Sequence, residues 1–239
     1  MAPQAALAAD RESAQELRRL LARLRSHHDS RSWWPARTRF EMMAGAVLTQ
    51  RTRWDDAAAA AGRLRRSRLL IAGRLLEAES ASIAALIRPC GNHRIKATRL
   101  VTLARFVEQH GGPAGLARWP TGRLRAALLN VPGIGPETAD VILLYAFGRP
   151  AFVADAYALR LLGRTGWLRR AGLTARYEAV RRRVTGILAG DHGRLAALHA
   201  VIVEHGKTLC RARPRCTDCF LAGDCDTGRT ATGSQRSSR

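Results

Sequence analysis

The sequence predicts an all-α protein, and three observations support this fold class. Apolar residues recur at helical spacing along most of the 239 residues, and the first such run contains Leu17, Leu20, Leu21 and Leu24. The β-branched runs are short, and no Asn-Gly turn marks a hairpin between strands. Hydrophobic residues make up 46% of the chain and charged residues 25%, which is typical of a globular protein that can bury a core.

Ten helices are expected, each from a stretch whose apolar residues share one face. By residue number they cover 12–28, 40–48, 55–64, 80–85, 95–107, 123–129, 136–145, 155–162, 177–188 and 195–203. Residues that favour helix starts stand before or at several of these stretches, and they are Thr52, Ser80, Thr121 and Asp155. Pro136 suits the first position of its helix, where the missing N–H costs nothing.

Prolines and glycines separate the stretches. Pro35 interrupts the chain between the first and second helix, and Gly111-Gly112-Pro113 ends the fifth. The tail 227–239 consists mostly of glycine, serine, threonine and arginine, which bury too little apolar surface to order a chain. We therefore expect the ends, residues 1–11 and 227–239, to be disordered.

The charge balance indicates the partner. Lysine and arginine number 40 and acidic residues 19, so the net charge is 40 − 19 = +21, and the pI is about 11.6. Such an excess of positive charge favours a polyanion, and nucleic acid is the expected partner. No apolar run approaches the roughly 20 residues of a membrane span, and no basic segment precedes an apolar one near the N-terminus. Secreted proteins, membrane proteins and adaptors for acidic partners are therefore disfavoured.

Four of the five cysteines form a compact C-x5-C-x2-C-x5-C pattern. They are Cys210, Cys216, Cys219 and Cys225. In a chain without an expected export signal this pattern favours a metal or cluster site over disulfides. Four thiolates suit either zinc or an iron–sulfur cluster. Cys90 stands alone and is expected to be a small buried residue.

A glycine-rich connection separates the helices 123–129 and 136–145. The segment Gly133-Ile134-Gly135 leads directly into the second helix. Glycine leaves no side chain between the backbone and a ligand, so the N–H groups of these three residues would face outward. Exposed N–H groups at a helix start form an anion site, and a phosphate fits it without any reading of sequence. The alternative is a tight turn without a ligand.

Several motifs, in the order in which they occur along the chain, resemble those of the endonuclease III group of helix-hairpin-helix DNA glycosylases. They are Val131-Pro132-Gly133-Ile134-Gly135, Thr138-Ala139-Asp140, Asp155 and the loop with four cysteines. Phe40-Glu41 and the stretch from Gly45 to Gln50 match the early core helix and glutamine-bearing turn of that family. The segment from Ile87 to Ala97 matches the part that wedges into DNA. The resemblance covers about Phe40 to Cys225, most of the chain.

The resemblance implies two helical lobes with a DNA groove between them. Residues 39–149 would form a six-helix barrel that contains the helix-hairpin-helix, residues 123–145. Residues 12–38 together with 150–226 would form the lobe that holds the cysteines. Those cysteines would bind a four-iron four-sulfur (4Fe-4S) cluster of structural role, with zinc as the alternative.

The implied reaction is base excision repair. A damaged or mismatched base is flipped out of duplex DNA, and its N-glycosidic bond is then broken through a cation-like sugar. A carboxylate stabilises that charge and activates water, and Asp155 is the candidate. Asp155 also fits the cap of the helix that follows it, which would hold its carboxylate in place.

Strand-cleaving members of the family carry a lysine where this sequence has Glu137. A carboxylate cannot form the Schiff base that strand cleavage requires, so we expect a monofunctional glycosylase that leaves an abasic site. Glu137 is the second candidate catalytic residue, because two nearby carboxylates shift each other's pKa. The alternative role is an acid that stabilises a helix start.

Further residues are expected to contact DNA. Gln50 would fill the space left by the flipped base, and Asn92 and His93 fall in the wedge segment. A basic loop would meet phosphates, through Lys207, Arg211, Arg213 and Arg215. Trp33, Trp34 and Trp54 would stack on the base or pack in the core.

The favoured substrate is an alkylated purine. The Trp33-Trp34-Pro35 element, the stretch 48–52 and Glu137 to Asp140 resemble the monofunctional branch that includes such enzymes; mismatched uracil or thymine stays open. Two other functions are also open: a DNA-binding protein with weak or no catalysis, and a lyase that uses another amine, such as Lys96, Lys207 or the N-terminus. We expect a monomer that binds lesion-bearing double-stranded DNA in the cytoplasm, associated with the nucleoid, and no membrane.

Overall fold

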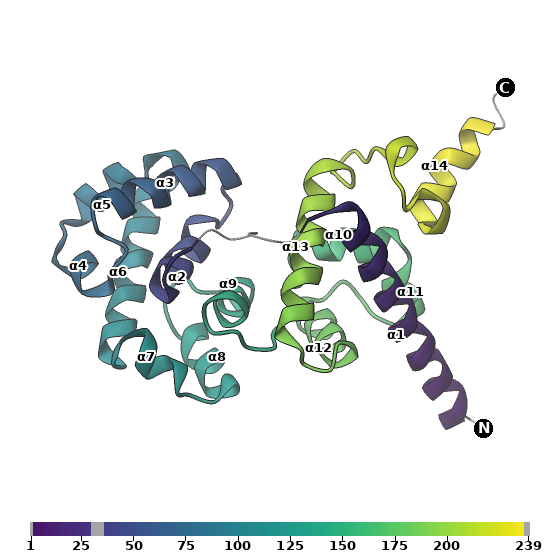
Figure 1. Ribbon diagram of the computed structural model, residues 1–239, viewed down its shortest axis with the longest axis horizontal. Coiled ribbons are helices and arrows are strands. Elements are labelled where there is room, and N and C mark those ends of the chain that lie inside the picture. The colour runs from purple at the N-terminus through teal and green to yellow at the C-terminus, as the bar shows by residue number, and fades with distance from the viewer. Residues whose placement is uncertain (1, 30–35, 237–239) are drawn as a thin grey trace. The chain divides into compact units, whose positions relative to one another are not determined.

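The computed structural model describes residues 2–29 and 36–236, and it confirms the all-α prediction. Helices account for all regular structure in these ranges, and no strand occurs there (Figure 1). The chain divides into two compact units, Met1–Trp33 with Pro150–Arg239 (unit 1) and Trp34–Arg149 (unit 2). Across the described residues, no helix combines the length and apolar character that a membrane span needs.

Unit 2 is built around one long helix. Its elements are α2 (Arg39–Leu48), α3 (Trp54–Arg66), α4 (Ala72–Glu77), α5 (Ser80–Leu86), η1 (Arg88–Cys90), α6 (His93–Gln109), α7 (Gly112–Ala117), α8 (Thr121–Leu129), α9 (Pro136–Val141) and the π-helical turn η2 (Ile142–Ala146). Helix α6 packs against α2, α4, α5 and α7. The buried face of α6 carries Ala97, Leu100, Leu103, Ala104 and Val107, at the spacing predicted from the sequence.

Helix α2 is buried on almost every side, and its start is fixed by polar contacts. The Thr38 hydroxyl accepts the Glu41 N–H at 3.1 Å, and the buried Glu41 carboxylate accepts the Arg37 N–H at 3.1 Å. The Arg65 side chain of α3 donates to the same carboxylate at 2.9 Å. These bonds satisfy orphan groups of the helix start and join α2 to α3.

Three predicted helix caps differ from the structure. Arg53, Glu79 and Pro120 occupy the cap positions, and none of them makes a side-chain cap bond. The Thr52 hydroxyl donates instead to the Cys90 carbonyl at 2.8 Å. Tertiary hydrogen bonding therefore overrides the local capping pattern at Thr52.

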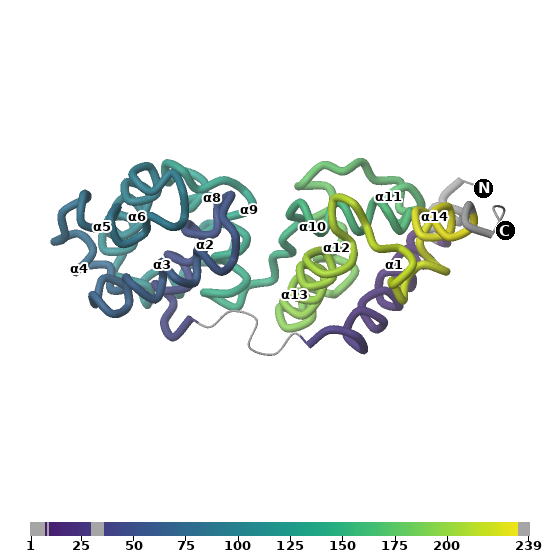
Figure 2. Tube along the Cα trace, turned by 90° about the horizontal axis from the view of Figure 1, so that it is seen from above, coloured from purple at the N-terminus to yellow at the C-terminus, as the bar shows by residue number. Residues whose placement is uncertain are grey.

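Unit 1 centres on α13. Its elements are α1 (Ala2–His27), α10 (Ala156–Arg164), α11 (Trp167–Arg170), α12 (Tyr177–Ile187), α13 (His192–Thr208), the short 3₁₀ turns η3 (Cys216–Asp218) and η4 (Ala222–Asp224), and α14 (Asp226–Arg236). Helix α13 packs against both α1 and α10 (Figures 1 and 2). The buried Trp167 indole donates to the Ser13 carbonyl at 2.8 Å and joins α11 to α1.

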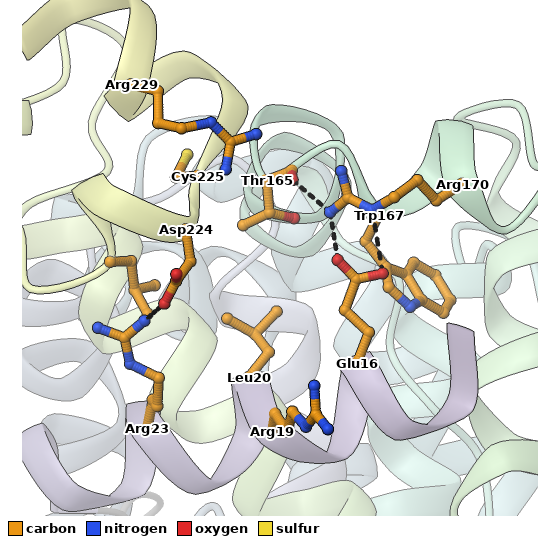
Figure 3. Close-up of a pocket in the computed structure, with 11 residues that line it drawn as sticks. Glu16, Arg19, Leu20, Arg23, Thr165, Trp167, Arg170, Asp224, Cys225 and Arg229 are labelled. Atoms are coloured by element: carbon orange, nitrogen blue, oxygen red, sulfur yellow. Dashed lines mark hydrogen bonds and ion pairs between the residues drawn. The ribbon is translucent and has the colours of Figure 1, made fainter. Parts of the chain in front are cut away.

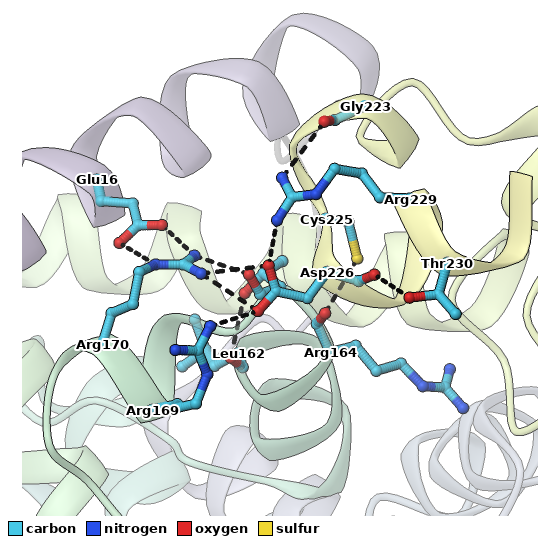
Figure 4. Close-up of polar contacts among 11 residues, drawn as sticks. Glu16, Leu162, Arg164, Arg169, Arg170, Gly223, Cys225, Asp226, Arg229 and Thr230 are labelled. Atoms are coloured by element: carbon cyan, nitrogen blue, oxygen red, sulfur yellow. Dashed lines mark hydrogen bonds and ion pairs between the residues drawn. The ribbon is translucent and has the colours of Figure 1, made fainter. Parts of the chain in front are cut away.

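The predicted disorder of residues 1–11 and 227–239 is wrong for the parts that the structure describes. Helix α1 begins at Ala2, in an alanine-rich stretch with high helix propensity, and α14 continues to Arg236. Asp226 in the first turn of α14 accepts bonds from Arg169 at 3.0 Å, Arg170 at 3.3 Å and Arg229 (Figure 4). These ion pairs anchor a segment whose composition alone favours disorder.

Candidate functional site

The glycine-rich connection forms a tight turn between α8 and α9. Val131 and Ile134 are buried and anchor the turn, whereas Gly133 and Gly135 are exposed. Gly133 has φ +88°, and a Cβ there would lie 2.6 Å from side-chain atoms of Arg99, so glycine is required. The Ile134 N–H donates to the Val131 carbonyl at 3.0 Å. Ile134 therefore supports the turn from inside, and the exposed amides belong to Gly133 and Gly135.

A buried ion pair joins the two helices of the hairpin. Arg125 of α8 donates to both carboxylate oxygens of Asp140 in α9, at 2.8 and 3.0 Å. Asp140 is fully buried, and the Arg125 side chain is mostly so. A bidentate ion pair of this kind fixes the angle between α8 and α9, and therefore the position of the turn that joins them.

Removing the Asp140 carboxylate should destabilise unit 2 strongly. We expect Asp140→Ala to cost about 3–5 kcal/mol of unfolding free energy, because it leaves the Arg125 charge buried without its partner. The check is urea-induced unfolding. The control is Glu178→Ala, which removes a half-exposed i,i+3 pair with Arg181 in α12 and should cost less than about 1 kcal/mol. Equal urea midpoints of unfolding for the two variants would contradict this structural role of the Arg125–Asp140 pair.

Gln50 lies against the hairpin, in a cluster that also contains Arg99 and Thr138. The Gln50 amide donates to the Gly133 carbonyl and to the Thr138 hydroxyl, both at 3.0 Å. Arg99 of α6 donates to the Gln50 side-chain oxygen at 2.5 Å. The structure thus brings together Gln50 and Gly133, which were predicted separately. It adds Arg99, which the sequence does not reveal because only the tertiary fold places it beside Gln50.

Lys96 is a buried structural anchor. Its ammonium is within hydrogen-bond distance of the Leu48 carbonyl (2.8 Å), the Cys90 carbonyl (3.0 Å) and the Thr52 hydroxyl. Burial lowers the pKa of this amine, and the three acceptors use its three donors. Lys96 therefore joins the end of α2 to the loop before α6, and its amine does not face a substrate.

The wedge segment presents a polar tip and one apolar side chain. Asn92 is exposed in the left-handed region at φ +44°, directly before α6, and His93 is half-buried at the helix start. Two residues further on, Ile95 is 55% exposed. The apolar residues of the predicted helix 95–107 were expected to share one face, and the exposure of Ile95, the first of them, corrects that expectation.

A small cavity lies between α2 and α3. Glu41, Thr49, Trp54 and Arg65 line it together with Ala36, Gly45, Ala57, Ala58 and Ala61. Trp54 is the first residue of α3, and its half-buried side chain lies at the edge of this cavity. Trp33 and Trp34, the other proposed stacking residues, lie outside the described residues.

Asp155 stands at the start of α10, in unit 1. One carboxylate oxygen accepts the Ala158 N–H at 2.8 Å, so the predicted cap is confirmed. The preceding segment 151–154 is buried, and the Phe152 N–H donates to the Thr185 hydroxyl of α12 at 3.1 Å. Two features therefore hold Asp155 in place: the buried segment that precedes it and the hydrogen bond that caps α10. Glu137 is exposed in the first turn of α9, in unit 2.

The four cysteines of the C-terminal pattern line one cavity. Leu161, Leu209, Leu221 and His205 are among the other residues that line it. Burial raises the pKa of the Cys219 and Cys225 thiols, and neighbouring cysteine thiols raise it further. No group of three or more cysteine, histidine or acidic side chains in the described chain converges on one point as an ion site.

Charged and polar side chains surround these cysteines. The Arg164 side chain lies 3.5 Å from the Cys210 sulfur, and the His205 ring lies 3.7 Å from the Cys219 sulfur. Burial lowers the pKa of His205 to about 4, so its ring is neutral at neutral pH. The Arg164 guanidinium therefore places a positive charge next to one of the four candidate ligands.

The basic loop between the first two cysteines is held by two arginines of α10. Arg164 donates to the Arg211 carbonyl and, at 2.8 Å, to the Ala212 carbonyl, and Arg160 donates to the Cys210 carbonyl at 2.8 Å. Arg211, Arg213 and Arg215 are exposed, as is Lys207 at the end of α13. The backbone of the loop is therefore fixed while its basic side chains remain on the surface.

A further cavity, larger than the one lined by the four cysteines, lies where the C-terminal segment meets α1. Its lining includes Cys225, Glu16, Arg23, Asp224 and Arg229, as Figure 3 shows. Arg23 pairs with Asp224, and Arg170 pairs with Glu16. The first pair holds the cysteine-bearing segment against α1, and the second pair holds α11 against α1.

Known DNA repair proteins resemble this chain over most of its length. Residues 44–188 match the HhH-GPD superfamily of base excision DNA repair proteins. A Methanocaldococcus jannaschii protein that bears the name of a DNA repair glycosylase is 37% identical over 205 residues, which span 84% of this chain and 92% of that protein.

Solved structures share the fold. Endonuclease III in a non-covalent complex with DNA gives a TM-score of 0.74 at 22% identity, over 92% of this chain and 98% of that one. The H. pylori 3-methyladenine DNA glycosylase bound to 1,N6-ethenoadenine gives a TM-score of 0.63 at 26% identity, over 82% of this chain and 97% of that one. The chain therefore belongs to the HhH-GPD superfamily and is an endonuclease III-like DNA glycosylase of base excision repair.

Proposed function

We propose that the protein is a monofunctional glycosylase, in which the Asp155 carboxylate stabilises the cationic sugar and activates water. The observation that carries this proposal is the double restraint on Asp155. A buried approach segment and a helix-cap bond at 2.8 Å hold a carboxylate that is still partly exposed. A charge fixed before the reaction stabilises a transition state at little cost in reorganisation.

Water is the proposed nucleophile because no suitable amine stands at the family's lysine position. Glu137 occupies that position, and a carboxylate cannot form a Schiff base. Lys96, considered as another amine, is buried and hydrogen-bonded through its ammonium. The product is therefore an abasic site in an intact strand. Glu137 serves as an acid at the start of α9, where the helix dipole favours it.

An alkylated purine is the proposed substrate. The Trp54 ring at the edge of the α2–α3 cavity offers a surface for stacking, and a base made cationic by alkylation is attracted to an indole face. The H. pylori relative, named a 3-methyladenine DNA glycosylase, supports the same class.

One chain carries both the hairpin and Asp155, so the proposed enzyme acts as a monomer.

DNA is the proposed partner of three surfaces. The exposed amides of Gly133 and Gly135 would bind a phosphate, Gln50 and the wedge segment 92–95 would occupy the space of the flipped base, and the basic loop would bind the backbone. Ile95 is the apolar side chain exposed in this segment, and it suits insertion between bases better than Asn92.

A 4Fe-4S cluster is the proposed occupant of the cysteine cavity. A tetrahedral zinc ion needs four sulfurs at about 2.3 Å from one point, whereas each thiolate of a four-iron cluster binds its own iron. The four thiols line one cavity, so each iron of a four-iron cluster would find one thiolate there. Cys210, Cys216, Cys219 and Cys225 would hold it and so fix the segment that carries the basic loop.

A panel of duplexes tests the reaction. Each duplex carries one change: 1,N6-ethenoadenine, another alkylated purine, a U·G or T·G mismatch, or an oxidised pyrimidine. We expect strand breaks only after alkali, and most on alkylated purines. Breaks without alkali, with a complex trapped by borohydride, would show a lyase. Tight binding without base release on any duplex would show a binding protein.

Replacing Arg213 should weaken DNA binding without changing which lesion is preferred. Arg213→Ala removes one exposed cation. The slope of the logarithm of the binding constant against the logarithm of the salt concentration should therefore become shallower by about one unit. The measurement is fluorescence anisotropy over a series of salt concentrations. Arg74→Ala, which removes an exposed arginine of α4, is the matched control and should leave the slope unchanged. An unchanged slope for Arg213→Ala would place that side chain off the DNA.

A further inference from the structure

A buried histidine faces the proposed catalytic carboxylate. His199 lies in the middle of α13, and α13 packs against α10, which Asp155 begins. The distance from Nε2 of His199 to Oδ2 of Asp155 is 3.5 Å. His199 could not be singled out from the sequence, because forty-four positions separate it from Asp155 and only the packing of two helices brings them together.

The two oxygens of the Asp155 carboxylate have different neighbours. Oδ1 accepts the Ala158 N–H in the helix cap, and Oδ2 lies toward His199. The cap alone leaves the carboxylate free to tilt about that one bond. A second contact on the other oxygen would fix the plane of the group, and an ionised carboxylate has lone pairs left for a substrate or a water molecule.

The surroundings of His199 favour this contact. The residue is only 4% exposed, and its neighbours Leu198, Ala200 and Ile202 are buried. An imidazole N–H in such a place is stabilised by an acceptor within the protein, and Asp155 supplies a carboxylate oxygen. The separation of 3.5 Å is longer than an ordinary hydrogen bond, and contacts of this kind shorten when the substrate is bound.

We infer that His199 is a positioning residue for the reaction, which donates from Nε2 to Oδ2 of Asp155 and orients the carboxylate toward the sugar. The inference rests on the proposed role of Asp155. His199 is buried, so it acts on the sugar only through that carboxylate. A displacement of about 1 Å in a reacting group can lower a rate by about 10²-fold, so orientation alone carries a large effect.

Single-turnover kinetics on the preferred lesion duplex test the inference. We expect His199→Leu to lower the rate of base release by about 10-fold to 10²-fold while the affinity for the duplex stays within about twofold. His199→Gln places an amide N–H near the position of Nε2 and should restore the rate to within about threefold of wild type. Circular dichroism and thermal unfolding establish that each variant is folded.

A double-mutant cycle separates positioning from a general structural role. In the Asp155→Asn background, adding His199→Leu should change the residual rate by less than about twofold, because the carboxylate on which it acts is gone. The same loss in both backgrounds would overturn the inference, and so would an unchanged rate for His199→Leu alone. If Asp155→Asn itself excises at the wild-type rate, the proposed function fails, whatever His199 does.

Nuclear magnetic resonance gives a readout that does not depend on the folding of a leucine variant. In the wild-type protein, the imidazole nitrogen shifts should assign the proton of His199 to Nε2, with the signal identified by its absence from His199→Gln. Asp155→Asn should move that signal. A neutral ring with its proton on Nδ1 would contradict the inference.

Discussion

Asp155→Asn should lower the single-turnover rate of base release by about 10³-fold and leave the affinity for lesion-bearing DNA within about twofold. Asparagine is as good a helix cap as aspartate, so the bond to the Ala158 N–H and the start of α10 are kept. The substitution therefore removes the charge and little else. The loss should appear in the chemical step, because the carboxylate acts on charge that develops only in the transition state.

A second capping aspartate supplies the matched control for this experiment. Asp191 accepts the Arg194 N–H at 3.1 Å at the start of α13, and it is exposed. Asp191→Asn makes the same chemical change at a helix start and should leave excision unaltered. Wild-type turnover by Asp155→Asn would remove this residue from the mechanism, and equal losses in both variants would indicate a structural effect.

Cys216→Ser should remove the proposed cluster, lower the melting temperature by about 10 °C and abolish detectable specific binding to DNA. The segment from Cys210 to Cys225 contains only short 3₁₀ turns and one buried leucine, Leu221. Bonds to the cluster would therefore supply most of its stability. Without them the hydrogen bonds from Arg160 and Arg164 still hold residues 210–212, but the rest of the loop, with Arg213 and Arg215, loses its shape. Iron analysis, visible absorbance and thermal unfolding of freshly purified protein measure the effect.

Cys90→Ala is the control for the cysteine experiment. Cys90 is buried in unit 2, and burial raises the pKa of its thiol, so it takes no part in the cluster. This variant should keep its iron, its colour and its affinity for DNA. A colourless wild-type protein that contains zinc would contradict the cluster, and full iron occupancy in Cys216→Ser would remove Cys216 from the set of ligands.

The parts of the fold that follow local rules could be predicted from the sequence. In the long helices α6 and α12 the apolar residues recur at a period close to 3.6, and most of them are buried in the structure, with Ile95 of α6 as an exposed exception. Asp155 as a helix cap follows from its residue type and the apolar run behind it. The short helices α4, α7 and α11 were missed, because four to six residues are too few to show a period.

The parts of the site that depend on tertiary contacts could not be predicted. Arg99 reaches Gln50 from another helix, and Arg164 of α10 holds the carbonyls of the basic loop. In a chain with 40 basic residues, the sequence does not distinguish an arginine that makes such contacts from one that lies on the surface. The buried Lys96 is the clearest case. Its charge suggests a surface residue or a nucleophile, and only the carbonyls around its ammonium reveal an anchor.

A crystal structure of the protein with a duplex that carries an uncleavable analogue of the lesion tests the central claim most directly. The account predicts an extruded nucleoside whose anomeric carbon lies about 3–3.5 Å from an oxygen of Asp155, or from a water held by that oxygen. It also predicts a DNA phosphate on the amides of Gly133 and Gly135. A nucleoside that remains stacked in the duplex, or whose anomeric carbon rests beyond the reach of Asp155 and its water, would contradict the account.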